Sequence, residues 1–293
     1  HGMQVLVDEA HGTHFYFQEK LPVTAMEAGA DMAAVSMHKS GGSLTQSSLL
    51  LLNHGVNEGY VKQIINLTQT TSASYLLISS LDISRRNLAL RGHESFEKVM
   101  RIAEYAREEI NEIGGYYAYS SELCNGTSCF AYDVTKLSVY TREIGLAGIE
   151  VYDLLRDEYD IQIEFGDIGN ILAYISIGDR IQDIERLVGA LADIKRLYAR
   201  DNTGMLSLEY IPPKVVATPQ EAFYADKEML PLSQTAGRIC SEFVMCYPPG
   251  IPILAPGEII TPDILEYIRY AKEKGCSMQG TEDPEIAHLN VLR

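Results

Sequence analysis

The sequence predicts an α/β fold with parallel strands, on the evidence of two short apolar runs and the residues that follow them. Residues 4–7 (QVLV) and 32–37 (MAAVSM) are separated by a segment long enough for a helix. Short continuous apolar runs are typical of strands buried on both faces, as in parallel sheets. Asp8 follows the first run directly, and Lys39 closely follows the second. Since parallel sheets bind their ligands at the carboxyl ends of the strands, we expect Asp8 and Lys39 to mark a site.

Two further elements complete the first part of the chain. Residues 48–52 form a third candidate strand after the turn-forming stretch SGGSLTQ. Between residues 96 and 113, apolar side chains recur at the three- and four-residue spacing of one helix face, and Gly114-Gly115 closes the helix. We expect this long helix to link two domains.

A smaller α+β unit is predicted after the linking helix. Its elements, in chain order, are a strand at 129–140, a helix at 145–159, strands at 161–165 and 170–177, and a helix at 180–198. Most of the prolines lie after residue 205, which predicts a loop-rich tail with short helices. These boundaries divide the chain into residues 1–115, 116–204 and 205–293.

Composition and charge place the chain among soluble globular proteins. It has 293 residues, of which 46% are hydrophobic and 22% charged, and its formal net charge is −16. Nucleic acids and acidic membranes are poor partners for this charge, because binding phosphates requires clustered Lys and Arg. No stretch approaches the roughly 20 apolar residues of a membrane span, and the start lacks the pattern of a signal peptide.

The cysteines predict reduced thiols and a cytoplasmic location. The five cysteines are odd in number and never spaced as CxxC, which argues against a disulfide framework and a structural zinc site. We expect Cys124 at the edge of a loop and Cys129 in a strand, without a redox function.

The segment DEAHGTHFYF (residues 8–17) and the stretch SMHKSGG (residues 36–42) hold the candidate chemistry. An unprotonated lysine amine forms a Schiff base with an aldehyde, and pyridoxal 5′-phosphate supplies such an aldehyde together with a ring that accepts electrons. Asp8 would pair with the ring nitrogen and keep it protonated. A metal site formed by Asp8, His11 and His14 is the less favoured alternative, because it leaves Lys39 unexplained. We expect His14 to be a hydrogen-bonded structural residue and expect no metal.

Five blocks of the sequence, in consistent order, closely resemble the Orn/Lys/Arg decarboxylases of fold type I, in particular the shorter bacterial arginine decarboxylase group. The blocks are VLVDEAHGTHFYF, GADMAAVSMHKSGGSLTQSS, QTTSASYLLISSLD, AGRICSEFVMCYPPGIPILAPGE and SMQGTEDPE. The resemblance implies an α/β fold that is the C-terminal portion of a fold-type-I, aminotransferase-like large domain, followed by a smaller α+β C-terminal region. It also implies that the N-terminal part of the large domain is absent from this chain.

The resemblance implies a role for each residue of the candidate site. Lys39 would carry the cofactor as a Schiff base, and Asp8 would bind the pyridine nitrogen. Ala10 would lie against the ring face and His11 would reach the ring hydroxyl. The remaining cofactor residues would contact the phosphate, orient the lysine or complete a neighbouring subunit's site: Ser36, His38, Thr71 and Ser72.

The implied reaction is decarboxylation of a basic amino acid, most simply arginine to agmatine. The bond to the carboxylate breaks to give a quinonoid intermediate, and Lys39 or His38 returns a proton to Cα. Glu164 and Glu258 are candidates to pair with the substrate's cationic end, and Arg238 with its carboxylate. Open alternatives are lysine or ornithine decarboxylation, another fold-type-I activity such as transamination, and an inactive fragment or structural homologue. The resemblance implies a homodimer or larger homo-oligomer.

Overall fold

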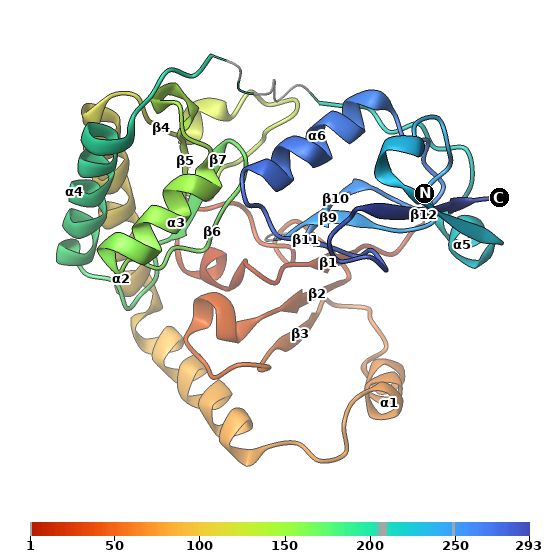
Figure 1. Ribbon diagram of the computed structural model, residues 1–293. Coiled ribbons are helices and arrows are strands. Elements are labelled where there is room, and N and C mark those ends of the chain that lie inside the picture. Colours follow the sequence, from red (N-terminus) through yellow and green to blue (C-terminus); the bar gives the residue numbers. More distant parts are fainter. Residues whose placement is uncertain (1, 204, 206–209, 248–249) are drawn as a thin grey trace. The chain divides into compact units, whose positions relative to one another are not determined.

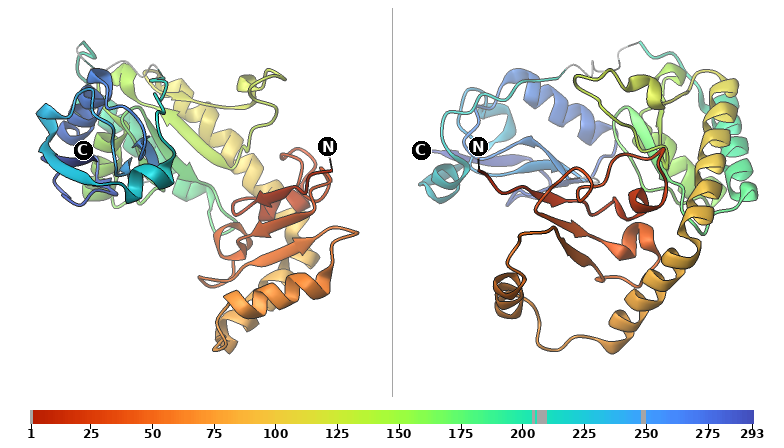
Figure 2. Two further views of the ribbon diagram at one scale, coloured as in Figure 1. Left: turned by 90° about the vertical axis from the view of Figure 1, so that its right-hand side faces the viewer. Right: turned by 180° about the vertical axis from the view of Figure 1, so that it is seen from behind.

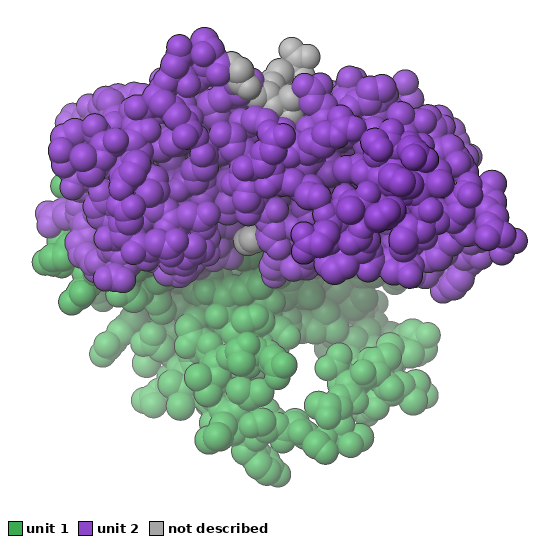
Figure 3. Space-filling model, in the orientation of Figure 1, with its two compact units in different colours: residues 1–107, 120–137, 175–184 green, residues 108–119, 138–174, 185–293 purple. Residues whose placement is uncertain are grey.

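The chain folds into two units, each assembled from segments that are distant in the sequence (Figure 3). In this computed structural model, residues 2–203, 205, 210–247 and 250–293 are described. Unit 1 comprises residues 1–107, 120–137 and 175–184, and unit 2 comprises residues 108–119, 138–174 and 185–293. Among the described residues, no helix is both long and apolar enough to cross a membrane. The predicted boundaries after residues 115 and 204 stay a prediction.

Unit 1 is built on a three-stranded sheet of β1 (Leu6–Asp8), β2 (Met32–Val35) and β3 (Leu49–Leu52), in that order (Figure 1). The three predicted strands are therefore confirmed. β1 pairs with β2 in parallel, whereas β3 runs antiparallel to β2. The chain between β2 and β3 contains only a single helical turn. This short connection suffices because antiparallel strands, unlike parallel ones, need no crossover helix between them.

Unit 1 also contains α-helices and short helical turns. They include the 3₁₀ turn η1 (Thr13–Phe17), the π-helical turn η2 (Met37–Gly41), and the helices α1 (Glu58–Thr68) and α2 (Tyr75–Ile113), whose last residues belong to unit 2. Figure 2 shows α2 as one continuous helix, which begins 21 residues before the predicted start. In its first half the buried positions recur every four residues, at Ser84, Leu88, Gly92 and Phe96. Two of these four residues are not hydrophobic, so apolar periodicity alone could not find this part of the helix.

A four-stranded sheet and two helices form the first part of unit 2. The strands, in sheet order, are β4 (Tyr117–Ala118), β5 (Lys136–Tyr140), β7 (Asn170–Tyr174) and β6 (Phe165–Gly166), and the helices are α3 (Gly148–Tyr159) and α4 (Ile181–Tyr198). The first residues of β5 and of α4 belong to unit 1. The predicted strands at 129–140 and 161–165 were too long, because only their C-terminal residues pair. The helices agree with the prediction within three residues.

Helix α3 begins in very close contact with the sheet, which its glycines permit. A Cβ atom on Gly148 would lie 1.8 Å from the carbonyl oxygen of Asn170, and one on Gly166 would lie 2.4 Å from that of Gly148. Gly189 in α4 has open space around it. Gly148 and Gly166 therefore allow the backbones of α3, β6 and β7 to approach each other.

The C-terminal part of unit 2 contains more strands than predicted. Its elements are α5 (Pro219–Tyr224), β8 (Lys227–Pro231), η5 (Leu232–Gln234), β9 (Val244–Cys246), β10 (Ile251–Leu254), α6 (Pro262–Glu273), β11 (Met278–Gln279) and β12 (His288–Leu292). β8 pairs with β12, and β9 lies between β10 and β11. Val244, Leu254, Ile268 and Leu289 are buried in its hydrophobic core. The expectation of a loop-rich tail with short helices missed these strands, because most of them are too short to show alternation.

Candidate active site

The parallel pairing of β1 and β2 brings the two candidate segments to the same edge of the sheet. Asp8 is the last residue of β1 and lies in register with Ala34 of β2. The next residue, Glu9, continues the pairing, since its N–H donates to the carbonyl oxygen of Ala34 at 2.9 Å. Past the end of β2, the chain enters η2, which carries Lys39. The predicted placement of both groups at carboxyl strand ends is confirmed.

Lys39 and His11 are in direct contact in this structure. Lys39 Nζ lies 3.1 Å from His11 Nε2, although the two residues are 28 positions apart. Both side chains are exposed, as is that of Asp8, so the face is accessible to a ligand. An ammonium at Lys39 donates to the imidazole nitrogen, and a neutral amine accepts from it. The contact therefore accommodates either protonation state of Lys39.

The carboxylate of Asp8 and the ring of His38 are held by the backbone. Asp8 Oδ1 accepts a hydrogen bond of 3.0 Å from the N–H of Ala10. His38 Nδ1 lies 2.9 Å from the carbonyl oxygen of Ser47, and because a carbonyl can only accept, this nitrogen carries the proton. In the neutral ring Nε2 is then the basic nitrogen. Ser36 is the N-cap residue of η2, next to these groups in the chain.

The turn that carries Lys39 is anchored from both sides. The N–H of Gly42 closes the π-helical turn by bonding to the carbonyl oxygen of Met37, and Gly42 adopts the left-handed conformation at φ 84°. The hydroxyl of Ser84 in α2 donates to the carbonyl oxygen of Gly41. The predicted reading of Gly41-Gly42 as a turn is therefore confirmed. Helix α2 thus fixes the end of the segment that presents Lys39.

His14 is a buried structural residue, as predicted. Its side chain is fully buried, and its Nε2 lies 2.9 Å from Asp133 Oδ2 and 3.1 Å from Thr135 Oγ1. Its ring also packs beside Phe15 and Phe96. This nitrogen is already hydrogen-bonded and is therefore not free to bind a metal ion in this arrangement. Among the residues that the structure describes, no group of three acidic, histidine or cysteine side chains has an arrangement suited to a metal ion.

Asp133 is a residue of this region that the sequence analysis missed. Burial opposes its ionisation, but the hydrogen bond and charge of His14 and the charge of Lys136 outweigh burial and lower the pKa of Asp133 well below 3.8. The N–H and hydroxyl of Thr135 also donate to Asp133 Oδ1, at 3.0 and 2.7 Å. Asp133 therefore stays ionised at neutral pH and fastens the segment 8–17 through His14.

Glu9 fastens the same segment at a second point. It is buried, accepts from the N–H of Ala25 at 2.9 Å, and accepts from the hydroxyl of Tyr16 at 2.8 Å. Burial and the adjacent carboxylate of Glu9 raise the pKa of Tyr16 to about 12. Glu9 is therefore a structural residue of this segment, whereas the neighbouring side chain of Asp8 is exposed.

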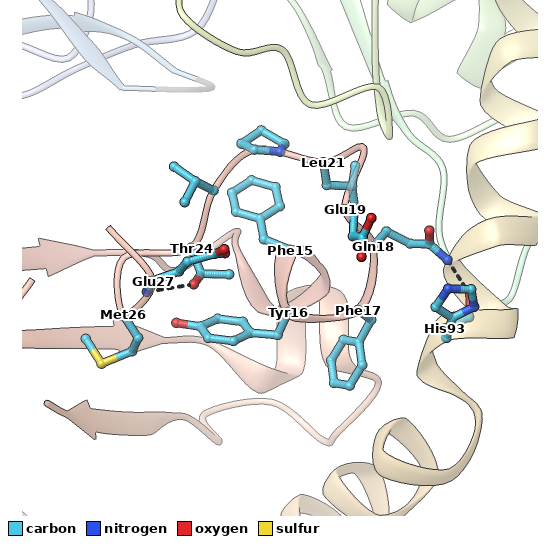
Figure 4. A pocket seen from close by; sticks show the side chains of 12 residues that line it. Phe15, Tyr16, Phe17, Gln18, Glu19, Leu21, Thr24, Met26, Glu27 and His93 are labelled. Carbon is cyan, nitrogen blue, oxygen red and sulfur yellow. Dashed lines mark hydrogen bonds between the residues drawn. The ribbon is translucent and has the colours of Figure 1, made fainter. Parts of the chain in front are cut away.

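The aromatic end of the segment borders an open pocket of about 830 Å³ (Figure 4). Phe15, Tyr16 and Phe17 line it together with His93 of α2. Gln18 Nε2 donates to the carbonyl oxygen of His93 at 2.6 Å, which ties the rim to α2. Lys39, His11 and Asp8 do not line this pocket, so it is separate from the candidate site.

The structure gives the remaining predicted residues local partners. Thr71 and Ser72 lie in the exposed segment between α1 and α2, where the N–H of Ser72 donates to Thr70 Oγ1. The other three predicted residues belong to unit 2. The N–H of Glu164 donates to the carbonyl oxygen of Leu172, and Glu258 accepts from the N–H of Ala255. Arg238 donates to Glu228 and to the carbonyl oxygen of Leu292. Their roles toward cofactor or substrate stay predictions.

Comparison with known proteins decides the family. The sequence profile of the Orn/Lys/Arg decarboxylase major domain matches residues 1–183, and that of the family's C-terminal domain matches residues 202–284. The chain belongs to the Orn/Lys/Arg decarboxylase family. Arginine decarboxylases of Bacillus subtilis and Bacillus anthracis are 42% and 44% identical to it over 293 residues, 99% of this chain. The chain spans about 60% of the length of these two curated relatives.

The same family fold is found in a solved structure. The lysine decarboxylase of Francisella novicida superposes with a TM-score of 0.78 at 18% sequence identity, covering 98% of this chain and 53% of that one. The chain therefore has the α/β fold of a fold-type-I decarboxylase, with a large domain followed by a C-terminal region, as the sequence predicted. The donor set at the strand ends fits a pyridoxal phosphate site, because the amine of Lys39 contacts the imidazole of His11 at the edge of the sheet where β1 ends in Asp8.

Proposed function

We propose that this chain is the lysine-bearing part of a pyridoxal-phosphate-dependent arginine decarboxylase that converts arginine to agmatine. The observation that carries the proposal is the contact of 3.1 Å between Lys39 Nζ and His11 Nε2, beside the strand end that carries Asp8. Arginine is favoured over lysine and ornithine because the relatives that match nearly the whole chain at 42% and 44% identity are named arginine decarboxylases.

The residues at the strand ends would hold the cofactor. Lys39 would bind its aldehyde carbon, and Asp8 would face the pyridine nitrogen with the carboxylate that Ala10 N–H holds in place. When bound, pyridoxal phosphate supplies a conjugated ring that withdraws electrons from the substrate. His11 would meet the ring hydroxyl, Ala10 the ring face, and Ser36 the phosphate.

Proton transfer would depend on His38 and Lys39 of η2 and on the neighbouring His11. Lys39 would exchange a proton with His11 across their hydrogen bond. Because the Ser47 carbonyl fixes the proton of His38 on Nδ1, His38 would use Nε2 to orient Lys39 or to return a proton to the substrate carbon. His38 and Lys39 are adjacent in η2, and substituting them one at a time would separate their roles.

The remaining predicted residues complete the proposal. Glu164 and Glu258 would pair with the guanidinium and Arg238 with the carboxylate of the substrate. Thr71 and Ser72 would reach the site of a neighbouring subunit in a homodimer or larger assembly. We place the enzyme in the cytoplasm, in keeping with five cysteines that are free thiols.

Borohydride trapping tests the cofactor site. The chain is incubated with pyridoxal phosphate, reduced with borohydride and mapped by peptide mass spectrometry. We expect a pyridoxyl group on Lys39, its loss in Lys39→Ala, and no change in Lys62→Ala, which removes an exposed lysine of α1. Labelling spread evenly over surface lysines would contradict the assignment of Lys39.

Product analysis tests the reaction separately. The chain, loaded with cofactor, is given arginine, lysine or ornithine, and released CO2 and amine are measured. Agmatine formation with arginine preferred supports the proposal. A trapped Lys39 with lysine as the preferred substrate would retain the cofactor site and overturn the substrate, whereas a keto acid product would indicate a transaminase.

A further inference from the structure

The loop between Cys124 and Cys129 brings two thiols together on unit 1. The chain leaves the 3₁₀ turn η3 (Ser121–Leu123), passes through Asn125-Gly126-Thr127-Ser128, and returns. The two Sγ atoms are 4.0 Å apart, and both cysteines are partly exposed. Cys129 lies in this loop, so its predicted position in a strand was wrong.

The loop is held in shape by the side chain of Asn125. Its Oδ1 accepts from the N–H groups of Thr127, Ser128 and Cys129, at 2.9, 2.9 and 3.2 Å. The N–H groups of Asn125 and Gly126 in turn donate to the carbonyl oxygen of Cys129, at 2.9 and 3.2 Å. These bonds bring the backbones at the two ends of the loop together, which is the arrangement that a disulfide requires.

We propose that Cys124 and Cys129 form a reversible dithiol–disulfide site, oxidised by a low-molecular-weight disulfide such as oxidised glutathione. A disulfide has an S–S distance of about 2.05 Å, so the two sulfur atoms need to approach by about 2 Å, which rotation of two partly exposed side chains can supply. Disulfides that form in a reducing compartment are typically transient and redox-sensing.

The oxidation is a pair of thiol–disulfide exchanges. One cysteine loses its proton to solvent, and its sulfur attacks a sulfur of the reagent, whose S–S bond breaks and releases one thiolate. The thiolate of the second cysteine then attacks the first cysteine's sulfur and displaces the other half of the reagent. The protein loses two electrons and two protons, and the reagent becomes two thiols.

The other cysteines are less suited to this chemistry. Cys240 is fully buried, and burial raises the pKa of its thiol to about 12, so it stays protonated. Cys246 and Cys276 are also neighbours, and the hydrogen bond with Cys276 lowers the pKa of Cys246, but Cys276 is buried and therefore less accessible to a disulfide reagent. All five cysteines are described by the structure, and the loop is the place where two partly exposed thiols face each other.

Peptide mapping after controlled oxidation tests the proposal. The reduced chain is equilibrated in glutathione buffers of increasing oxidation, quenched with N-ethylmaleimide, digested and analysed by mass spectrometry. We expect a peptide that is cross-linked between Cys124 and Cys129 and that returns to two alkylated cysteines after dithiothreitol. Separate alkylation of both cysteines in every buffer, or a cross-link at another pair, would overturn the proposal.

Variants separate the pair from the rest of the chain. In Cys129→Ser the cross-link must disappear and glutathione must remain on Cys124, because the second thiol is missing. Cys246→Ser is the matched control and leaves the cross-link unchanged. A cross-linked peptide of unchanged yield in Cys129→Ser would show that another cysteine is the partner of Cys124 and would overturn the assignment.

Asn125 tests the contribution of the loop. Removing its acceptor in Asn125→Ala is expected to lower the equilibrium constant for disulfide formation about tenfold, whereas Asn125→Asp keeps the acceptor and stays near the parent value. Equal constants in all three proteins would overturn the claim that the loop geometry builds this site.

Discussion

His14 Nε2 and Asp133 Oδ2 form a hydrogen bond of 2.9 Å between residues 119 positions apart, with His14 fully buried. This bond anchors the segment that presents Asp8 and His11 to a loop far along the chain. Because the carboxylate can only accept, the bond also fixes the proton of His14 on Nε2. His14 thus helps to position the segment that carries the proposed cofactor residues Asp8 and His11.

Asp133→Asn should destabilise the chain. The amide keeps the shape of the side chain but loses the charge, and a buried partner left poorly satisfied costs about 1 to 3 kcal/mol. Urea unfolding at pH 7 measures the loss. The matched control is Asp82→Asn, whose exposed ion pair with Arg85 should be worth less than about 1 kcal/mol. Equal small losses in both variants would show that the His14 contact contributes little.

The stability of the chain should decrease as the pH is lowered, over a range set by the pKa of Asp133. Its folded pKa lies below the ordinary value of 3.8, so the unfolded chain binds the proton more readily. The stabilisation is therefore complete above about pH 5 and is lost as the pH falls through about 4 toward the folded pKa. Unfolding curves between pH 7 and pH 3 should show a steeper decline for the parent chain than for Asp133→Asn. Parallel declines would contradict this assignment.

Asp8→Asn should separate cofactor binding from turnover. The lysine remains, so borohydride should still trap pyridoxal phosphate on Lys39. The neutral amide cannot stabilise a protonated ring, and loss of such an electrostatic contact typically costs about 10² to 10³ in rate. CO2 release from arginine measures this effect. Asp8→Glu, which keeps the charge, is the comparison, and an Asp8→Asn enzyme as fast as the parent would exclude Asp8 as the ring partner.

Alanine substitutions at two helix glycines should change the stability of the chain in opposite directions. Gly148→Ala places a Cβ 1.8 Å from the carbonyl oxygen of Asn170, and relief requires moving backbone, so we expect a loss above about 3 kcal/mol or failure to fold. Gly189→Ala lies in open space inside α4 and should stabilise by about 0.5 to 1 kcal/mol. Thermal unfolding of both variants checks the pair. Similar shifts in the two variants would contradict the close contact at α3.

The positions of the strand-end residues could be predicted because the sequence pattern that marks them is local. Asp8 and Lys39 each follow an apolar run, and the parallel pairing of β1 and β2 places them at one edge as expected. The contact between Lys39 and His11 then follows from short connections. The family resemblance supplied the roles of these residues, which their spacing alone left open.

Other features depended on contacts that no local pattern encodes. Asp133 pairs with His14 across 119 positions, and its neighbours suggested a strand. The first half of α2 buries Ser84 and Gly92, where the small side chains allow contact with the Lys39 turn and with Phe17. Hydrophobic periodicity reads such positions as polar or neutral, although tertiary packing makes them core.

The π-helical turn that carries His38 and Lys39 makes the length of this segment as important as its composition. The turn is closed by the bond from Gly42 N–H to Met37 carbonyl, five residues apart. Deleting one residue would convert it to an ordinary α turn and rotate the following side chains by about 100°. Lys39 would then point away from His11, even though both residues remain in the chain. Single-residue deletions and insertions here should therefore be far less tolerated than most substitutions.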